Sequence, residues 1–285
     1  MAEAEDRRNL AALSGFGGDE AASSHSKRVL VLVLGCDRQP WRRIEAEGQR
    51  TTWLSNAIPN VRVLYYYGTA KGLGYWSVAI MSKGLHVLRQ ERLRGLFLRW
   101  TGARYALAAR ESGDRLYLQI PETFGNIGAK TVGALRYVLG RYEFDYLYRT
   151  NISSYTHLPL LQEFVQSLPE ARYYGGFLGQ ERNISFAAGS GILLSRDLVE
   201  FAARDPEWNW ELMDDVALAC SMTRAGVQPQ AIPRIDIDSP DKVALVAPDR
   251  WRTCFSVRCK SAGNRLQDIE TMRRVHAADL RAWNA

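Results

Sequence analysis

The chain has 285 residues, of which 46% are hydrophobic and 24% are charged. This composition excludes a disordered or fibrous protein and allows one large domain with a buried core. The net charge is +6, but the basic residues form no long run and no series of aromatic residues lies among them. Nucleic acid is therefore not expected as a partner.

The four cysteines include no Cys-x-x-Cys pair, so free thiols in a reducing compartment are expected. No stretch approaches the roughly 20 apolar residues that span a bilayer, and the N-terminus lacks the apolar centre of a signal peptide. We expect a soluble protein without a transmembrane segment, either cytoplasmic or peripheral to a membrane. Residues 1–26 are rich in Ala, Gly, Ser and acidic residues and are expected to form a mobile tail.

From residue 27 on, predicted strands alternate with predicted helices. Short runs of β-branched, aromatic and leucine residues predict strands at 28–35, 61–67, 115–120 and 144–148. Helices are predicted at 39–56, 82–110, 126–141 and 158–168. The alternation indicates an α/β fold with a mainly parallel central sheet and helices on both faces, whose ligands bind beyond the carboxyl ends of the strands.

The second half of the chain continues without a linker, so a single domain is expected. The small residues at 187–191 are predicted to open a helix that runs to about residue 203, and Asp214 is predicted to open another that ends near Gly226. A strand is predicted at 230–237 and a last helix from about residue 264. We divide the chain into a domain at 27–248 and a basic segment with a helix at 249–285 that packs on it.

Two common nucleotide-binding motifs are absent. The segment from Gly125 to Thr131 is similar to a phosphate-binding loop, but Ala129 precedes Lys130 where that loop needs glycine. No Gly-x-Gly-x-x-Gly fingerprint follows the first strand. Four scattered histidines predict no metal cluster.

Four segments in order resemble a known family. These are the first strand with the basic stretch after it, a segment with Gly-Asp and Asn-x-x-x-Lys-Thr, an Ala-Gly-Ser-Gly segment and an Asp-Asp-Val segment. The residues that carry the first two matches are Arg42, Arg43, Arg50, Thr52, Trp53, Gly113, Asp114, Thr123, Phe124, Asn126, Lys130 and Thr131. Over residues 28–225 the chain resembles the inverting β1,3-galactosyltransferase/fringe-like glycosyltransferases, which have the GT-A fold.

The resemblance implies a transfer of a hexose from a nucleotide sugar, UDP-linked in this family, to a hydroxyl of a glycan, glycolipid or glycoprotein. It places the general base at Asp215 of Asp214-Asp215-Val216. A carboxylate in the first turn of a helix is also what helix capping favours without catalysis. Arg43 and Arg50 are implied to bind the donor. The segment Gly189-Ser190-Gly191 is implied to contact the sugar, although glycine there also suits tight packing.

One departure from the family concerns the metal. Its Lys-Thr-Asp-Asp-Asp segment corresponds here to 149–153, where Asn151 and Ser153 replace carboxylates. Mn2+ or Mg2+ prefers charged oxygen ligands, so metal-independent transfer is the favoured hypothesis and a metal ion the alternative. Asp236 and Asp238 are a weaker alternative pair of ligands.

Without a metal, cationic side chains must neutralise the diphosphate. The candidates are Lys130 and Arg149, together with Arg258 and Lys260 near the C-terminus. Asn151 and Ser153 are candidates for hydrogen bonds to the donor.

A second hypothesis is a catalytically silent relative that binds sugar or a protein partner. The missing carboxylates favour it, whereas Asp215 and the basic C-terminus favour the enzyme. Relatives of this kind are commonly Golgi proteins, so a Golgi location is expected if the sequence lacks an N-terminal anchor.

Overall fold

The computed structural model describes residues 26–55, 58–70 and 109–284, together with the short stretches 80–81, 84–85, 87–90, 92–93 and 96–97. All of the tail predicted at 1–26 except residue 26, and most of the helix predicted at 82–110, lie outside these residues. The two described residues at the end of that predicted helix, Ala109 and Arg110, lie in a strand instead, since β3 spans Ala109–Ser112.

An eight-stranded sheet forms the centre of the molecule. Four neighbouring strands in it, β4, β2, β1 and β5, are parallel, as predicted. Its strand order is β3-β4-β2-β1-β5-β8-β7-β9. Their bounds are β1 Val29–Leu34, β2 Val61–Ala70, β4 Arg115–Pro121, β5 Tyr146–Asn151, β7 Tyr174–Glu181, β8 Ile184–Ser195 and β9 Gln230–Ala231. The pairs β4–β2, β2–β1 and β1–β5 are parallel, whereas β8 runs antiparallel to both β5 and β7.

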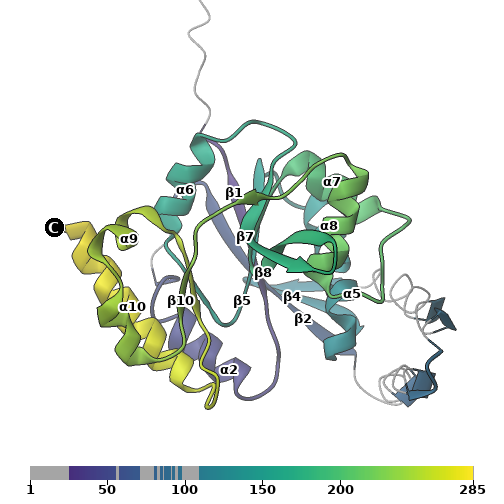
Figure 1. The fold of residues 1–285 in the computed structure, drawn as a ribbon, viewed down its shortest axis with the longest axis horizontal. Helices are drawn as coiled ribbons and strands as arrows, with labels where there is room; N and C mark the ends of the chain where they lie inside the picture. The colour runs from purple at the N-terminus through teal and green to yellow at the C-terminus, as the bar shows by residue number, and fades with distance from the viewer. Residues whose placement is uncertain are drawn as a thin grey trace, which may run out of the picture.

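Helices cover both faces of this sheet, which confirms the predicted α/β class (Figure 1). The β-branched residues of β1 pack into one core and its leucines into the other, because successive side chains of a strand point to opposite faces. On the first face lie α2 Trp41–Arg43, η1 Ile44–Gln49, α6 Leu158–Gln166 and α10 Gln267–Asn284. On the second lie α5 Ile127–Leu139, α7 Arg196–Arg204 and α8 Asp214–Arg224.

The segment 187–191 does not open a helix as predicted but lies inside β8, and α7 begins only at Arg196. Further along β8, Leu193 pairs with Tyr148 of β5 and with Gly175 of β7, so both edges of the strand are hydrogen-bonded. Its small residues allow close packing, since a side chain at Gly176 would collide with Ala187. The sequence signal of small residues therefore reflects strand packing.

A second sheet, of three strands, places residues from late in the sequence next to the end of β5. It has the order β10-β11-β6, with β6 Ser154–Thr156, β10 Ile235–Ile237 and β11 Ser256–Cys259. The strand predicted at 230–237 is split into β9 and β10, and Pro233, which has no N–H to donate, lies between them. The helical turns η2 Phe124–Asn126, η3 Pro240–Leu245 and α9 Pro248–Thr253 complete the described elements. Among the described residues, no helix is both long and apolar enough to cross a membrane.

Candidate functional site

The predicted residues after β5 meet those of β8 at the carboxyl end of the parallel strands. Arg149 pairs with Ile192 in the strand register, so the residues before Ile192 run past the end of β5. Thr150 Oγ1 donates to the Ser190 carbonyl at 2.8 Å, and Asn151 Nδ2 donates to the Gly189 carbonyl at 3.3 Å. The structure thus brings together two segments that are about 40 residues apart in the sequence.

Four cationic side chains lie beside these segments, and we call them the cation cluster: Arg234, Arg258, Lys260 and Arg265. Arg234 Nη1 donates to Ser190 Oγ at 2.6 Å, and Arg265 Nη2 donates to Ser153 Oγ at 2.5 Å. Two of the four are thereby fixed to serines predicted to belong to the site. Arg258 lies in β11, and Lys260 is the first residue after this strand.

Like charges are held close together in the cation cluster. Burial lowers the pKa of Arg258, and Arg234 lowers it further. Burial also lowers the pKa of Lys260, and the neighbouring charges of Arg258 and Arg265 add to this effect. A lowered pKa of a cation means that its charged form is disfavoured in the folded protein, so an anion bound there would relieve the repulsion.

Two carboxylates only partly neutralise the cation cluster. Asp236 lies 2.9 Å from Arg234 Nη2 and 4.0 Å from Arg258 Nη1. Asp268, which is fully buried, pairs with Arg265 and also accepts hydrogen bonds from Ser261. Four cations against two carboxylates leave a surplus of positive charge at the end of β5.

Asp215 lies on the other side of the Gly189–Ser190 segment, in the first turn of α8. Its Oδ2 accepts the Gly189 N–H at 2.9 Å, and its Oδ1 accepts the Val216 N–H at 3.0 Å. Burial raises the pKa of Asp215, as does the adjacent Asp214, while the Gly189 N–H and Arg149 oppose the shift. A carboxylate with a raised pKa is a stronger base than an ordinary exposed aspartate, as a general base requires.

Arg149 is buried beneath this segment, with 4% of its side chain exposed. Its guanidinium donates to the Tyr66 hydroxyl at 3.1 Å, to Asp214 Oδ2 at 2.5 Å and to the Gly189 carbonyl. Burial works against its charge, but Asp214, Tyr66 and Asp215 together outweigh burial, so the pKa of Arg149 is raised. All three of its nitrogens therefore have partners inside the protein.

The other predicted donor-binding residues lie apart from the cation cluster. Arg43 pairs with Glu47 at 2.7 Å on an exposed surface. Arg50 lies between Asp114 at 2.7 Å and Glu45 at 2.9 Å. Lys130 is buried, pairs with Glu122 and lies 3.4 Å from the Gly35 carbonyl at the end of β1.

Gly191 is committed to packing: an added Cβ would lie 2.6 Å from the Tyr148 hydroxyl and 3.0 Å from Ser256 Oγ. Its neighbours Gly189 and Ser190 make the contacts to Asp215 and Arg234 described above.

The residues at the end of β5 do not fit a divalent metal ion. Asn151 Oδ1 already accepts the Ser153 N–H at 3.0 Å and the Ser154 hydroxyl at 3.2 Å. Asp238, one of the alternative ligands, pairs with Lys242 at 2.7 Å. No group of three or more His, Cys, Asp or Glu side chains among the described residues is arranged to hold a metal.

Arg234 and Arg265 were not predicted as site residues. Arg265 belongs to the basic C-terminal segment, but Arg234 belongs to no motif. It lies beside Ser190 because it stands between β9, which pairs with β7, and β10, which pairs with β11. The guanidinium of Arg234 also lies 3.8 Å from the centre of the Phe177 ring. Such contacts join segments that are far apart in the sequence.

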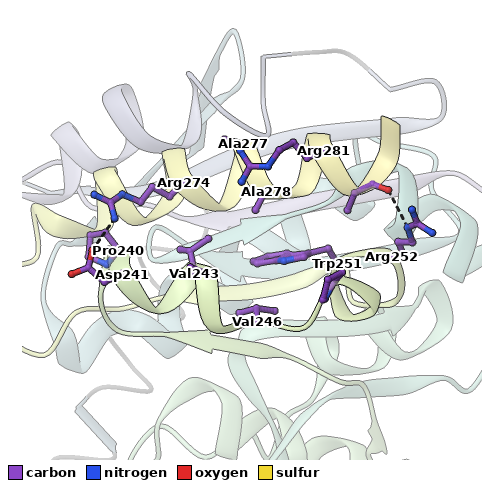
Figure 2. A pocket seen from close by; sticks show the side chains of 13 residues that line it. Pro240, Asp241, Val243, Val246, Trp251, Arg252, Arg274, Ala277, Ala278 and Arg281 are labelled. Atoms are coloured by element: carbon purple, nitrogen blue, oxygen red, sulfur yellow. Dashed lines mark hydrogen bonds and ion pairs between the residues drawn. The ribbon is translucent and has the colours of Figure 1, made fainter. Parts of the chain in front are cut away.

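A separate groove of about 620 Å³ runs between α10 and the segment that holds η3 and α9 (Figure 2). Trp251, Val243 and Ala278 line its apolar part, and Arg274 and Arg252 lie toward its opposite ends. None of the predicted site residues lines it, so the groove is distinct from the site at the strand ends.

The sequence matches no family model and no curated protein. Its fold is similar to that of a mannosyltransferase from Pyrobaculum calidifontis, solved in complex with GDP-Man and Mn2+, with a TM-score of 0.44 and 13% identity over 91% of this chain and 75% of that chain. It is also similar to the apo form of the glycosyltransferase GlyE from Streptococcus pneumoniae TIGR4, with a TM-score of 0.40 and 11% identity over 91% and 63% of the two chains. Similarity at this level does not assign a chemistry, so the function has to be argued from the chain's own residues.

Proposed function

We propose that the protein is an inverting glycosyltransferase that moves a hexose from a nucleotide sugar, UDP-linked, to a hydroxyl acceptor without a metal ion. One observation carries the proposal: the cation cluster lies on one side of the Gly189–Ser190 segment and the Asp215 carboxylate on the other. Departure of a diphosphate needs positive charge, and attack by a hydroxyl needs a base.

The reaction is a single displacement. The acceptor oxygen forms a bond to the anomeric carbon, and the bond from that carbon to the diphosphate oxygen breaks. The electron pair of that bond leaves on the diphosphate, and the proton of the acceptor hydroxyl passes to Asp215. One displacement from the side opposite the leaving group inverts the anomeric centre.

In this mechanism the cation cluster takes the part that a metal ion plays elsewhere. Arg258 and Lys260 supply charge that the carboxylates nearby do not fully neutralise. Guanidinium and ammonium groups bind phosphate oxygens through charge-assisted hydrogen bonds. The serines that hold Arg234 and Arg265 keep two of these groups in place before the ligand arrives.

Asp215 can still accept a proton although both of its oxygens receive backbone N–H bonds. A carboxylate has about four lone-pair sites, and the two hydrogen bonds use two of them. The same two bonds hold the carboxylate in one orientation. The base is therefore positioned before the acceptor binds.

The experiment is incubation with a panel of UDP- and GDP-sugars, each with EDTA and with Mn2+, while the release of nucleoside diphosphate is followed. We expect release with at least one UDP-sugar and an equal rate in EDTA. Activity that appears only with Mn2+ would contradict the metal-free mechanism but keep the transferase.

The second candidate is a silent sugar- or partner-binding relative. It is favoured by the backbone bonds of Asp215, which are also those of a residue that only stabilises the start of a helix. A folded protein that binds a nucleotide sugar but releases no diphosphate under any of these conditions would establish it.

A further inference from the structure

A closed ring of contacts surrounds the carboxylate that we assign as the base. Asp215 Oδ2 is held by the Gly189 N–H at 2.9 Å, and the carbonyl of the same Gly189 is held by Arg149. Arg149 Nη2 also contacts Asp214, the residue directly before the base, at 2.5 Å. The ring runs through Arg149, Asp214, Asp215 and Gly189 and returns to Arg149.

This ring joins three elements of the fold. Arg149 belongs to β5, Gly189 to β8, and the two aspartates to the first turn of α8. Asp214 is held a second time, by Thr131 Oγ1 of α5 at 2.9 Å. The direction of the Asp215 carboxylate is therefore set by contacts that converge on the buried guanidinium.

Gly189 has to be glycine for the ring to close. A Cβ at this position would collide with the Arg149 guanidinium and would lie 3.2 Å from Asp215 Oδ2. The backbone of β8 thus passes between the arginine and the base without a side chain to separate them.

The charges in the ring act on the base in opposite directions. Asp214 favours the protonated form of Asp215, and Arg149 favours the ionised form. With 4% of each side chain exposed, Arg149 and Asp214 are screened little by water. Loss of the Arg149 charge alone would leave the negative charge of Asp214 beside the base without its counter-charge.

We propose that Arg149 is the positioning residue of this site: it ties Asp214 and the Gly189 carbonyl together, and thereby fixes the place and the proton affinity of the Asp215 carboxylate, without contacting the nucleotide sugar. This inference rests on the proposed function, because Asp215 is the base only there. It assigns to Arg149 a role different from the donor contact implied by its position in the family motif.

The test uses two variants of the full chain. Arg149→Lys keeps a charge but cannot reach Tyr66, Gly189 and Asp214 together, because an ammonium lacks the planar fork of a guanidinium. The double variant Arg149→Met with Asp214→Asn removes both charges, so that no buried charge is left unpaired if the single variant fails to fold. Arg196→Lys is the matched control, because Arg196, like Arg149, contacts both backbone carbonyls and carboxylates but does so away from the site.

We expect kcat to fall about 100-fold in both Arg149 variants, the usual effect of a displaced catalytic group, while KM for the nucleotide sugar stays within about twofold. In Arg149→Lys the acid limb of the pH profile of kcat should move to higher pH, because Gly189 is no longer held by the guanidinium and its N–H hydrogen bond, which favours the ionised form of Asp215, is weakened. The Arg196→Lys control should change neither quantity. A raised KM with an unchanged kcat would overturn the proposal and make Arg149 a donor contact.

A second measurement separates this inference from the proposed function. The carboxyl carbon of Asp215, assigned by its loss in Asp215→Asn, can be titrated by NMR in the wild type and in Arg149→Lys without any substrate. A midpoint that moves to higher pH supports the role of Arg149 even if no transfer is found with any sugar. An unmoved midpoint overturns that role even if transfer is found.

Discussion

The Arg234 guanidinium donates to the hydroxyl of Ser190 at 2.6 Å, and this bond links the C-terminal part of the chain to the strand that also carries Gly189. Adjacent residues of β8 thereby contact the cation cluster and the Asp215 carboxylate, Ser190 the former and Gly189 the latter. Arg234 has 6% of its side chain exposed, so its charge acts in an environment that water screens little.

Replacement of the base should stop turnover and spare binding. In Asp215→Asn we expect the affinity for the nucleotide sugar to stay within about twofold and kcat to fall about 10²- to 10⁴-fold, the usual contribution of a general base. Calorimetry and a diphosphate-release assay measure the two quantities. An unchanged kcat would remove Asp215 from the mechanism.

Loss of a cation from the cluster should weaken the binding of UDP. Arg258→Gln and Lys260→Gln should each reduce the affinity about tenfold, because a hydrogen bond between a charged donor and a phosphate contributes about 1.5 kcal/mol at a partly exposed site. The loss should be absent for uridine, which has no phosphate. Lys242→Gln is the control, because Lys242 is an exposed lysine that pairs with Asp238. Equal losses in all three variants would indicate a general effect of charge and no specific site.

A side chain at Gly189 should disturb the site itself. In Gly189→Ala the new Cβ meets the Arg149 guanidinium, and such overpacking costs about 1–3 kcal/mol. We expect a lower midpoint of urea unfolding and a lower kcat. Gly263→Ala should leave both unchanged, since nothing lies within 4 Å of a Cβ at that position. Full activity in Gly189→Ala would show that the ring around Asp215 tolerates displacement.

The pH dependence of stability should reveal Asp279, whose pKa burial raises to about 6. The folded state favours the protonated form, so the contribution of Asp279 to stability is full below about pH 4 and is lost as the pH rises through about 6. In Asp279→Asn, the free energy of unfolding relative to the wild type should therefore increase between pH 4 and pH 7. Urea unfolding at several pH values measures it, and parallel curves would contradict the assignment.

His157 acts in the opposite direction in the same range. Burial lowers its pKa to about 4, so its contribution is present above pH 6.5 and is lost as the pH falls through about 4. Its Nε2 lies 3.5 Å from Asp279 Oδ2. The comparison with Asp279→Asn isolates the aspartate because His157 is present in both proteins.

The strands and helices that the sequence predicted well are those with a clear hydrophobic period. The parallel core strands and the helices at α5, α6 and α8 have such periods and were predicted within a few residues. The prediction that 187–191 opens a helix was wrong. Glycine, serine and alanine produce no hydrophobic period in the sequence, and pairing of β8 with β5 and β7 makes this segment part of a strand.

The site was predicted in part for a related physical reason. Seven predicted residues lie together, and they belong to motifs, follow strands or lie in the basic C-terminal segment. They are Asn151, Ser153, Gly189, Ser190, Asp215, Arg258 and Lys260. Arg149 follows the same logic, but its carboxylate partner is 65 residues away, so its burial in an ion pair was not visible in the sequence. Arg234 and Arg265 lie outside the strands, and they reach the site because β9 pairs with β7 and β11 pairs with β6.

The three-stranded sheet β10-β11-β6 makes the site depend on the order of synthesis. Strands β1 to β8 and the helix that bears Asp215 emerge from the ribosome before any of the four cations does. A nascent chain that ends before Arg234 contains the parallel strands and Asp215, yet it lacks Trp251, Phe255 and Val257 of one core and all four cations that we propose to hold a diphosphate. The proposed affinity for a diphosphate therefore depends on residues 234–285, which are made last and also cover one face of the sheet.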